Sequence, residues 1–599
     1  MSAYSTLPQP PSLGQRVPDR PHAVSVHLPK WRDVVDFSAG ESRVRTVQKG
    51  GYPRSFLHEA IAKAHRVLLD RFGGGGDSNN NQSCLLFPMH QYAIACKKYL
   101  CSPPDGSKDV DEQHVSIQSF SFDVVGSAGK KKMTLHATFF PAEDAKNAMI
   151  FWRLTGCGIS SRLAQDMLPG LDEAVSVSGS SAADTPLPRD ETAETVIQQR
   201  IASLLDRAPV GGPRKQLVKP DDVLLYPTGM SAIYNCTRAL GASLPGAQMV
   251  VFGFPYELTL KVQEDFAKAC TFYGFGTDDE LDQFEHLLVS KAAAGGHSPP
   301  IQAVWCECAS NPLLRTVDLD RIRRLADRYG FVVVVDDTIG SFANVDVLGV
   351  ADLVVTSLTK TFSGYADVMG GSVVINPCSG HYPRLRALFS AAFAPTLYGA
   401  DAAQLERNSR DYLARTAILN QNASYLVSLL EPLTRHHHDR SPLSHVFHPS
   451  TCGWSAQNYA ARMRPPTDDL VPGFGYLLTL EFCSVEAAAA FFDALPVCKG
   501  PSIGAQVTLA LPYVQVVFAK EKPWAARYGL SEAIVRISVG LEDQKALAMA
   551  CLEAMRAADA VVNRDDHDDD RVTLGKDVLA VSGLESVPLA RPTPLVPQM

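Results

Sequence analysis

The chain has 599 residues, of which 46% are hydrophobic and 20% are charged. This length and composition argue against a small stapled scaffold or a largely disordered chain, and they predict more than one folding unit. The 56 Lys and Arg residues are outnumbered by 64 Asp and Glu residues, which argues against a general nucleic-acid binder. No apolar run reaches the roughly 18 residues of a membrane span, and no targeting peptide is recognisable. We therefore expect a soluble, cytoplasmic protein.

The ends of the chain and two internal stretches are too polar to pack. Residues 1–20 are rich in Pro, Ser and Gln and predict a flexible N-terminus. We expect an N-terminal region over 21–215 that contains polar inserts at 73–83 and 176–194, the second leading into a helix. The acidic and Pro-rich residues 564–599 predict a disordered tail.

The middle of the chain has the pattern of a parallel α/β sheet. Short apolar runs rich in β-branched residues predict buried strands at 249–252, 303–306, 331–335 and 353–355. Between the second and third runs, residues 318–330 show a helical apolar face that ends at a glycine. Strand, helix and strand in this order indicate parallel pairing. We assign this sheet to a domain over 216–400, followed by a smaller C-terminal domain over 401–563.

An acid and a lysine follow two of these strands. Asp336 comes directly after one apolar run and Lys360 shortly after the next, so a crossover connection would bring both to one rim of the sheet. Pyridoxal 5′-phosphate requires such a pair, a lysine to bind its aldehyde and a carboxylate to keep its ring nitrogen protonated. Taken alone, a lysine here is usually solvated and an acid is usually a helix cap, so the hypothesis depends on their conjunction.

Two groups of residues could anchor a phosphate beside this pair. Ser357 and Thr359 alternate along the exit of the last strand and can both direct hydroxyl groups to one side. Gly229 and Met230 begin a helical segment after Pro-Thr, and the first N–H groups of a helix favour an anion. The alternative is that the hydroxyl residues only form turns.

The stretch that carries the lysine resembles a known family. Residues 357–371 (SLTKTFSGYADVMGG) are similar to the cofactor-lysine motif of the pyridoxal-phosphate-dependent enzymes of cysteine and methionine metabolism. The likeness is greatest to the long, fungal-type cystathionine gamma-synthases, and it covers most of residues 20–556. The other matching segments are 51–54 (GYPR), 307–312 (ECASNP), 408–411 (NSRD) and 535–542 (VRISVGLE).

The resemblance implies roles for five further residues. In relatives, the counterpart of Tyr256 stacks on the cofactor ring, that of Asn311 lies near the ring oxygen, and that of Arg536 binds the substrate carboxylate. Tyr52 and Arg54 match residues that reach across a subunit interface to the neighbour's phosphate. The resemblance therefore implies a homodimer or homotetramer with shared active sites.

The resemblance also implies the fold and the activity. The fold is that of the fold-type I, aspartate-aminotransferase-like transferases, with a large parallel-sheet cofactor domain and a smaller C-terminal α+β domain. The activity is γ-replacement of an O-acetyl or O-succinyl L-homoserine by L-cysteine, which gives L-cystathionine. Lys360 and Tyr256 are the catalytic candidates. A sulfhydrylase, a γ-substitution enzyme with a carbon nucleophile, a γ-lyase and a non-catalytic cofactor-binding regulator are the alternatives, because fold and cofactor do not select the nucleophile.

Two residues depart from the family pattern. Asp337 replaces an Asn and adds a carboxylate beside Asp336, and Tyr365 replaces a His. The adjacent His436, His437 and His438 cannot all face one ion, so we predict a solvated loop and no metal site. The expected partners are small-molecule substrates, with neither nucleic acid nor membrane.

Overall fold

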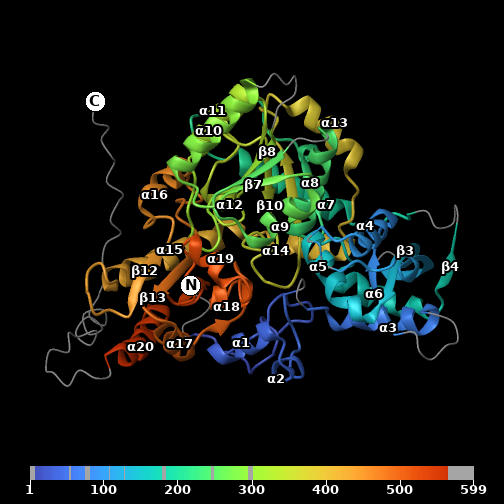
Figure 1. Cartoon of the computed structure of the whole chain (residues 1–599), viewed down its shortest axis with the longest axis horizontal. Coiled ribbons are helices and arrows are strands. Elements are labelled where there is room, and N and C mark those ends of the chain that lie inside the picture. The colour runs from blue at the N-terminus through green and yellow to red at the C-terminus, as the bar shows by residue number, and fades with distance from the viewer. Residues whose placement is uncertain are drawn as a thin grey trace.

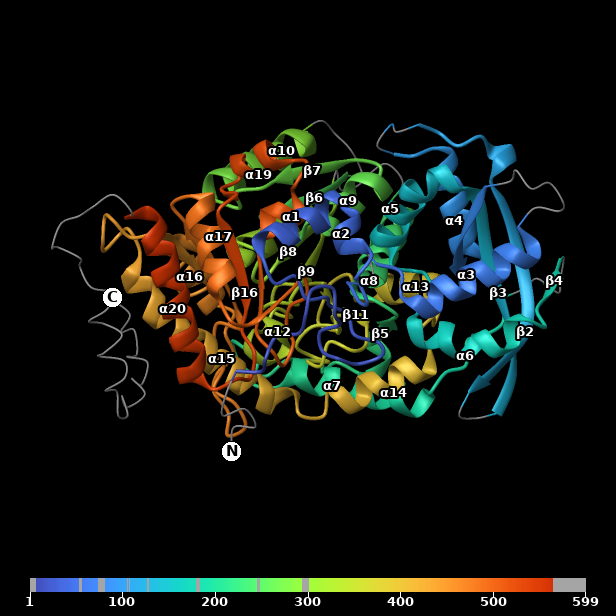
Figure 2. The same cartoon turned by 90° about the horizontal axis from the view of Figure 1, so that it is seen from below.

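The computed structural model describes residues 7–52, 56–73, 81–104, 106, 108–126, 129–178, 184–244, 248–293 and 301–563. Three sheets organise the described chain. A central domain separates an N-terminal lobe from a C-terminal region, and the two lie at opposite ends of the molecule (Figures 1 and 2). The predicted tail over 564–599 lies outside the described residues. Within them, no helix is long and apolar enough to cross a membrane.

Seven strands form the central sheet, in the order β5-β11-β10-β9-β8-β6-β7. Only β11 runs antiparallel to its neighbours. The four predicted strands are confirmed as β6, β8, β9 and β10, whereas the antiparallel β11 was not predicted. The strands are β5 (Val223–Tyr226), β6 (Gln248–Phe252), β7 (Cys270–Tyr273), β8 (Ile301–Glu307), β9 (Val332–Asp336), β10 (Leu353–Thr356) and β11 (Gly371–Ile375).

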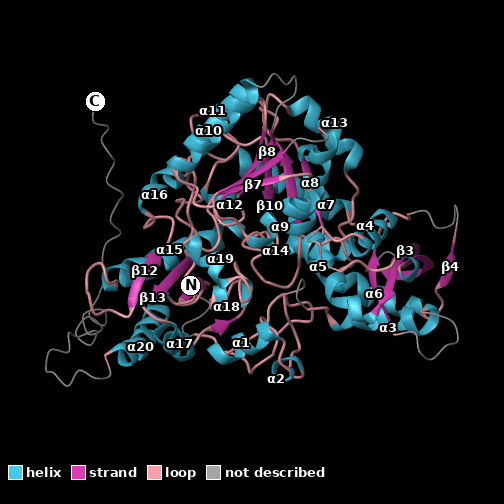
Figure 3. Cartoon of the chain, in the orientation of Figure 1, coloured by secondary structure: helices cyan, strands magenta, loops and turns pink. Residues whose placement is uncertain are grey.

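Helices cover both faces of this sheet (Figure 3). Alternate residues of β9 enter two separate cores, Val334 on one face and Val333 and Val335 on the other, which explains the unbroken run of valines. The predicted helix over 318–330 is confirmed as α11, and Gly330 adopts the left-handed C-cap conformation (φ 78°). The helices are α7 (Glu191–Asp206), α8 (Gly229–Ser243), α9 (Glu257–Phe266), α10 (Asp278–Ala293), α11 (Leu319–Tyr329), α12 (Ser341–Asn344), α13 (Tyr382–Ala392) and α14 (Gly399–Asn408).

The C-terminal region contains a five-stranded sheet in the order β12-β13-β16-β15-β14. Its apolar core lies between the sheet and the helices α15, α17 and α20. The elements are α15 (Tyr412–Leu430), β12 (Leu443–Phe447), α16 (Gly453–Ala460), β13 (Leu477–Phe482), α17 (Val485–Ala494), β14 (Cys498–Lys499), β15 (Leu509–Leu511), α18 (Tyr513–Val517), α19 (Lys522–Arg527), β16 (Ile534–Ser538) and α20 (Gln544–Val562).

The N-terminal segment packs on the C-terminal region. It contains α1 (Trp31–Ala39) and α2 (Ser42–Arg45), and the backbone N–H of Leu28 donates to the carbonyl of Lys499. We predicted a flexible stretch over 1–20, but the described residues 7–20 are packed: Val17 is only 2% exposed. The segment is ordered because its few apolar side chains meet buried side chains of the C-terminal region.

The N-terminal lobe, residues 59–177, is built on a four-stranded sheet in the order β1-β3-β2-β4. Gln82 and Ser83, which we placed in a polar insert, form the start of β1. The helix predicted after the second insert is confirmed as α7, which buries Ile197 and Ile201. The elements of the lobe are α3 (Glu59–Phe72), β1 (Gln82–Phe87), α4 (His90–Cys101), β2 (Ser116–Gly126), β3 (Gly129–Pro141), α5 (Ala145–Thr155), α6 (Ser161–Leu171) and β4 (Val175–Val177).

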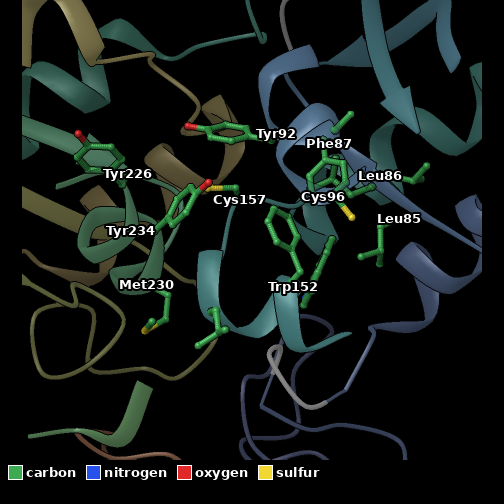
Figure 4. Packing of buried hydrophobic residues seen from close by; sticks show 14 of the residues in the cluster. Leu85, Leu86, Phe87, Tyr92, Cys96, Trp152, Cys157, Tyr226, Met230 and Tyr234 are labelled. Atoms are coloured by element: carbon green, nitrogen blue, oxygen red, sulfur yellow. The ribbon is translucent and has the colours of Figure 1, made fainter. Parts of the chain in front are cut away.

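One apolar core runs from this lobe into the central domain. Figure 4 shows Trp152 and Phe87 of the lobe in the same cluster as Tyr226 and Tyr234 of the central domain. The hydroxyl of Tyr92 donates across the junction to Asn235 of α8 at 3.2 Å. The lobe therefore packs against α8, the helix that we predict to hold a phosphate.

Candidate active site

The carboxyl ends of the parallel strands carry most of the predicted site residues. Asp336 is the last residue of β9, and Ser357 and Lys360 follow β10. Tyr256 follows β6, and Asn311 follows β8. Ligands of such sheets bind at this edge, so one rim presents an acid, a lysine, a tyrosine and an amide.

Asp336 is buried at the centre of this rim. Its carboxylate accepts hydrogen bonds from the backbone N–H of Thr338, at 2.9 Å, and from the Thr338 hydroxyl. Burial raises the pKa of Asp336, and the bonds from Thr338 and the charge of Lys360 oppose that shift. A buried, oriented carboxylate of this kind favours a neighbouring cation such as a protonated pyridine nitrogen.

Lys360 lies against Tyr52. The lysine Nζ donates to the tyrosine hydroxyl at 2.9 Å and lies 4.5 Å from the ring centroid. In the structure Tyr52 contacts the lysine of its own chain, and its contact with a neighbouring subunit, which we predicted, stays a prediction. The N-terminal segment packs over the C-terminal region of the same chain, with the Ser502 hydroxyl donating to the carbonyl of Val24. Arg54 lies outside the described residues, and its contact with a phosphate stays a prediction.

The beginning of α8 forms a cradle beside the lysine. Thr228 caps the helix by accepting from the N–H of Ser231, which leaves the N–H groups of Gly229 and Met230 without that cap. A Cβ atom on Gly229 would lie 2.7 Å from the Cβ of Ser357, so only glycine allows this close approach. The Thr359 hydroxyl instead bonds to the backbone of Gly370, and its role at a phosphate stays a prediction.

Arg536 of β16 reaches the same rim from the C-terminal region. It is buried, donates to Asn311 Oδ1 at 3.1 Å and to the carbonyl of Pro501 at 2.9 Å, and lies over the ring of Tyr513. A guanidinium has five N–H donors, so these bonds orient Arg536 and leave it able to bind a carboxylate. The structure thus places Arg536 and Asn311 together, and their roles at the substrate carboxylate and the ring oxygen stay predictions.

The two departures from the family pattern both make local hydrogen bonds, although the second carboxyl oxygen of Asp337 is buried without a hydrogen-bond partner among the described residues. Asp337 accepts a hydrogen bond from the Thr356 hydroxyl at 2.6 Å, and burial raises its pKa to about 7. Tyr365 donates to Asp411 at 2.7 Å, and the guanidinium groups of Arg20 and Arg415 lie near its ring. Asp337 thus resembles a neutral amide over most of the acidic range.

Two residues that the sequence did not reveal support the site. Arg415 of α15 is buried and donates to the carbonyls of Thr361 and Phe362, which directly follow the lysine. Glu307, at the end of β8, accepts from the N–H of Tyr256 at 2.8 Å. Hydrogen bonds to backbone groups leave no spacing signal in a sequence, although Glu307 lies in the quoted motif 307–312.

These residues define the class of the protein. A lysine, a buried acid with a charge-favouring environment, a glycine-lined helix start and a buried arginine fit the aldehyde, ring nitrogen, phosphate and amino-acid carboxylate of a pyridoxal-phosphate enzyme. Residues 214–556 match the Cys/Met metabolism PLP-dependent enzyme family. The chain belongs to that family, and its cofactor is pyridoxal 5′-phosphate. Residues 60–160 match the N-terminal domain of fungal trans-sulfuration enzymes.

Several characterised fungal proteins are similar over nearly the whole chain. The cystathionine gamma-synthase-like enzyme iboG1 of Amanita muscaria is 36% identical, over 94% of this chain and 100% of its own. The alanine racemase ungC of Aspergillus violaceofuscus is 36% identical, over 93% and 98%. The cystathionine gamma-synthase of Neurospora crassa is 31% identical, over 92% and 99%. A solved cystathionine gamma synthase of Xanthomonas oryzae pv. oryzae is 22% identical with a TM-score of 0.48, covering 61% of this chain and 98% of its own.

Proposed function

We propose that the protein catalyses γ-replacement on an O-acylated L-homoserine, with L-cysteine as nucleophile and L-cystathionine as product, a step of methionine biosynthesis. The observation that carries the proposal is the placement of Lys360, Asp336 and Arg536 around one rim of the central sheet. The Neurospora crassa relative, a cystathionine gamma-synthase that aligns almost end to end, supports the choice of reaction.

Three residues bind and orient the reactants in this proposal. The cofactor, when bound, withdraws electrons from the amino-acid carbons and makes their protons acidic. Arg536 binds the α-carboxylate of the substrate with paired hydrogen bonds. Asp336 keeps the proton on the nitrogen of the cofactor's pyridine ring, and the aromatic side chain of Tyr256 would cover one face of that pyridine ring.

Lys360 moves the protons. Its amine takes a proton from Cα and then assists removal of one from Cβ, which allows the acyloxy group to leave Cγ as a carboxylate. The cysteine thiolate then forms a C–S bond at Cγ, and Lys360 returns protons to Cβ and Cα. One C–O bond breaks and one C–S bond forms, and the thiol proton balances the released carboxylate. The Tyr52 hydroxyl, at 2.9 Å, holds the amine between transfers.

Other nucleophiles would give the same site other activities. Sulfide or a carbon nucleophile in place of cysteine would make the protein a sulfhydrylase or another γ-substitution enzyme. Loss of the acyloxy group with no nucleophile added at Cγ, followed by hydrolysis to 2-oxobutyrate and ammonia, would make it a γ-lyase. A second candidate is racemisation at Cα, favoured by the similarity to the Aspergillus violaceofuscus alanine racemase. Racemisation needs the first of the proton transfers and a return of the proton to the opposite face.

Product identification by mass spectrometry tests the proposal. The purified protein with pyridoxal 5′-phosphate is incubated with O-acetyl- or O-succinyl-L-homoserine and with cysteine or sulfide, and L-alanine is tested separately for D-alanine. We expect cystathionine to form faster than homocysteine. Dominant homocysteine, 2-oxobutyrate or D-alanine would instead identify a sulfhydrylase, a γ-lyase or a racemase. Turnover of none of these substrates by the cofactor-loaded protein would favour a regulator.

A further inference from the structure

The carboxyl group of Glu307 joins the loops after two different strands. Glu307 ends β8, and its side chain is buried, with 8% of the residue exposed. Its Oε1 atom accepts a hydrogen bond from the backbone N–H of Tyr256, at 2.8 Å. The backbone N–H of Asn311 also donates to the carboxyl group. The Glu307 side chain therefore binds the backbone of both Tyr256 and Asn311. Tyr256 is predicted to stack on the cofactor ring, and Asn311 is predicted to lie near the ring oxygen.

Glu307 also lies beside the acid that we assign to the ring nitrogen. β8 and β9 pair in parallel with Glu307 in register with Asp336. The charged groups that act on Glu307 are Asp336 and Glu257, both negative, and together with burial they raise its pKa well above the usual value. Burial beside Asp336 thus favours the uncharged form of Glu307, which adds no second charge next to that acid.

We propose that Glu307 is a positioning residue of the cofactor site, which fixes Tyr256 and Asn311 in one relation to Asp336. The carboxyl group has two oxygens that can accept from the N–H groups of Tyr256 and Asn311, whereas an amide at this position has one accepting oxygen and an NH₂ group that cannot accept. The inference concerns the cofactor and does not depend on which nucleophile the enzyme uses.

The test compares two identical substitutions at buried carboxyl groups. Glu307→Gln changes the proposed residue, and Glu542→Gln is the control, because Glu542 is also buried and accepts from both the N–H and the hydroxyl of Thr508. Pyridoxal 5′-phosphate is titrated into the cofactor-free proteins, and the visible circular dichroism of the bound cofactor is recorded. We expect Glu307→Gln to weaken cofactor binding about tenfold and reduce the dichroic band, because a misplaced ring loses its fixed asymmetric surroundings.

A double substitution distinguishes positioning from a general loss of structure. If Glu307 acts through Tyr256, then Glu307→Gln has a smaller effect on cofactor affinity in a Tyr256→Leu background than in the wild type. Additive effects, equal losses in Glu307→Gln and Glu542→Gln, or an unchanged affinity and dichroic band in Glu307→Gln would overturn the proposal.

A shorter acid covers the case in which Glu307→Gln does not fold. Glu307→Asp keeps both oxygens but withdraws them by one methylene. We expect it to fold, with cofactor affinity reduced and the dichroic band weakened. Wild-type affinity in a folded Glu307→Asp protein would equally overturn the proposal.

Discussion

Asp336 and Asp337 are adjacent, and their surroundings give them different protonation behaviour. Asp336 accepts two hydrogen bonds from Thr338, and the positive charge of Lys360 opposes the rise in the pKa of Asp336 that burial causes. Asp337 receives one bond from Thr356, and burial raises its pKa to about 7. Below neutral pH, Asp337 is therefore mostly protonated and changes the charge at the cofactor site little. Its effect is instead on the stability of the folded protein.

The effect of Asp337 on the free energy of unfolding depends on pH in a defined direction. Between about pH 4 and pH 7 the unfolded chain has lost a proton that the folded protein retains, so stability falls as pH rises. We expect Asp337→Asn to remove this loss and to raise the free energy of unfolding at about pH 8 by on the order of 2–4 kcal/mol, with no gain near pH 4. Thermal unfolding at both pH values measures the difference. Asp439→Asn, at an exposed residue, serves as the control, and an equal gain there would contradict the explanation.

Lys360 is the residue on which the chemistry depends. We expect Lys360→Ala to lower turnover at least about a thousandfold, because no amine then moves the substrate protons. The far-ultraviolet circular dichroism and the unfolding temperature of the cofactor-free protein should stay close to those of the wild type, since the side chain of Lys360 is only half-buried. Full activity of Lys360→Ala would exclude the assigned site.

Helix α8 shows how one element prepares a site. It begins where Gly229 passes close to Ser357, and its own Tyr234 is buried in the core that joins the lobe to the central domain. Its last turns carry a second glycine, Gly241, which is exposed and has no atom within 4 Å of a would-be Cβ. The same helix thus contains one glycine that close approach requires and one that it does not.

These two glycines give a matched pair of substitutions. We expect Gly229→Ala to weaken binding of pyridoxal 5′-phosphate at least about tenfold, because its methyl group would displace Ser357 from the cradle. Gly241→Ala should leave cofactor affinity unchanged and stabilise the helix by about 0.5–1 kcal/mol. Titration of cofactor and thermal unfolding measure the two effects. Equal affinities in the two variants would mean that the start of α8 does not hold the phosphate.

The sequence predicted elements where a local pattern was sufficient. The valine run of β9 and the Gly330 cap of α11 were recognisable because burial on both faces and left-handed backbone each select residue types. The antiparallel β11 was missed because strand direction leaves no mark in composition. The bonds from Arg415 to the lysine loop were missed because they join residues more than 50 positions apart.

At the scale of the whole molecule, the N-terminal segment contributes a residue to the candidate active site. It packs on the C-terminal region and places Tyr52 on Lys360 of the same chain. The family resemblance had predicted that this tyrosine comes from a neighbouring subunit. The two arrangements differ in a way that hybrid oligomers reveal.

Mixing two inactive variants distinguishes them. Chains with Lys360→Ala and chains with Tyr52→Ala are expressed together with different affinity tags, so that hybrid oligomers are isolated and counted. We expect no activity beyond the sum of the two variants, because neither chain has an intact pair. If tyrosines are exchanged between subunits, each isolated hybrid dimer would have one intact site of two and regain about half of the wild-type activity.

The core that joins the lobe to the central domain limits how such enzymes diversify. Because Trp152, Phe87 and Tyr234 lie in one cluster, the lobe presents to α8 a surface that only a complementary α8 accepts. A chimera that takes the lobe from one homologue and the central domain from another would leave cavities and overlaps beneath the helix. Recombination should therefore succeed only when the lobe and α8 are inherited from the same parent.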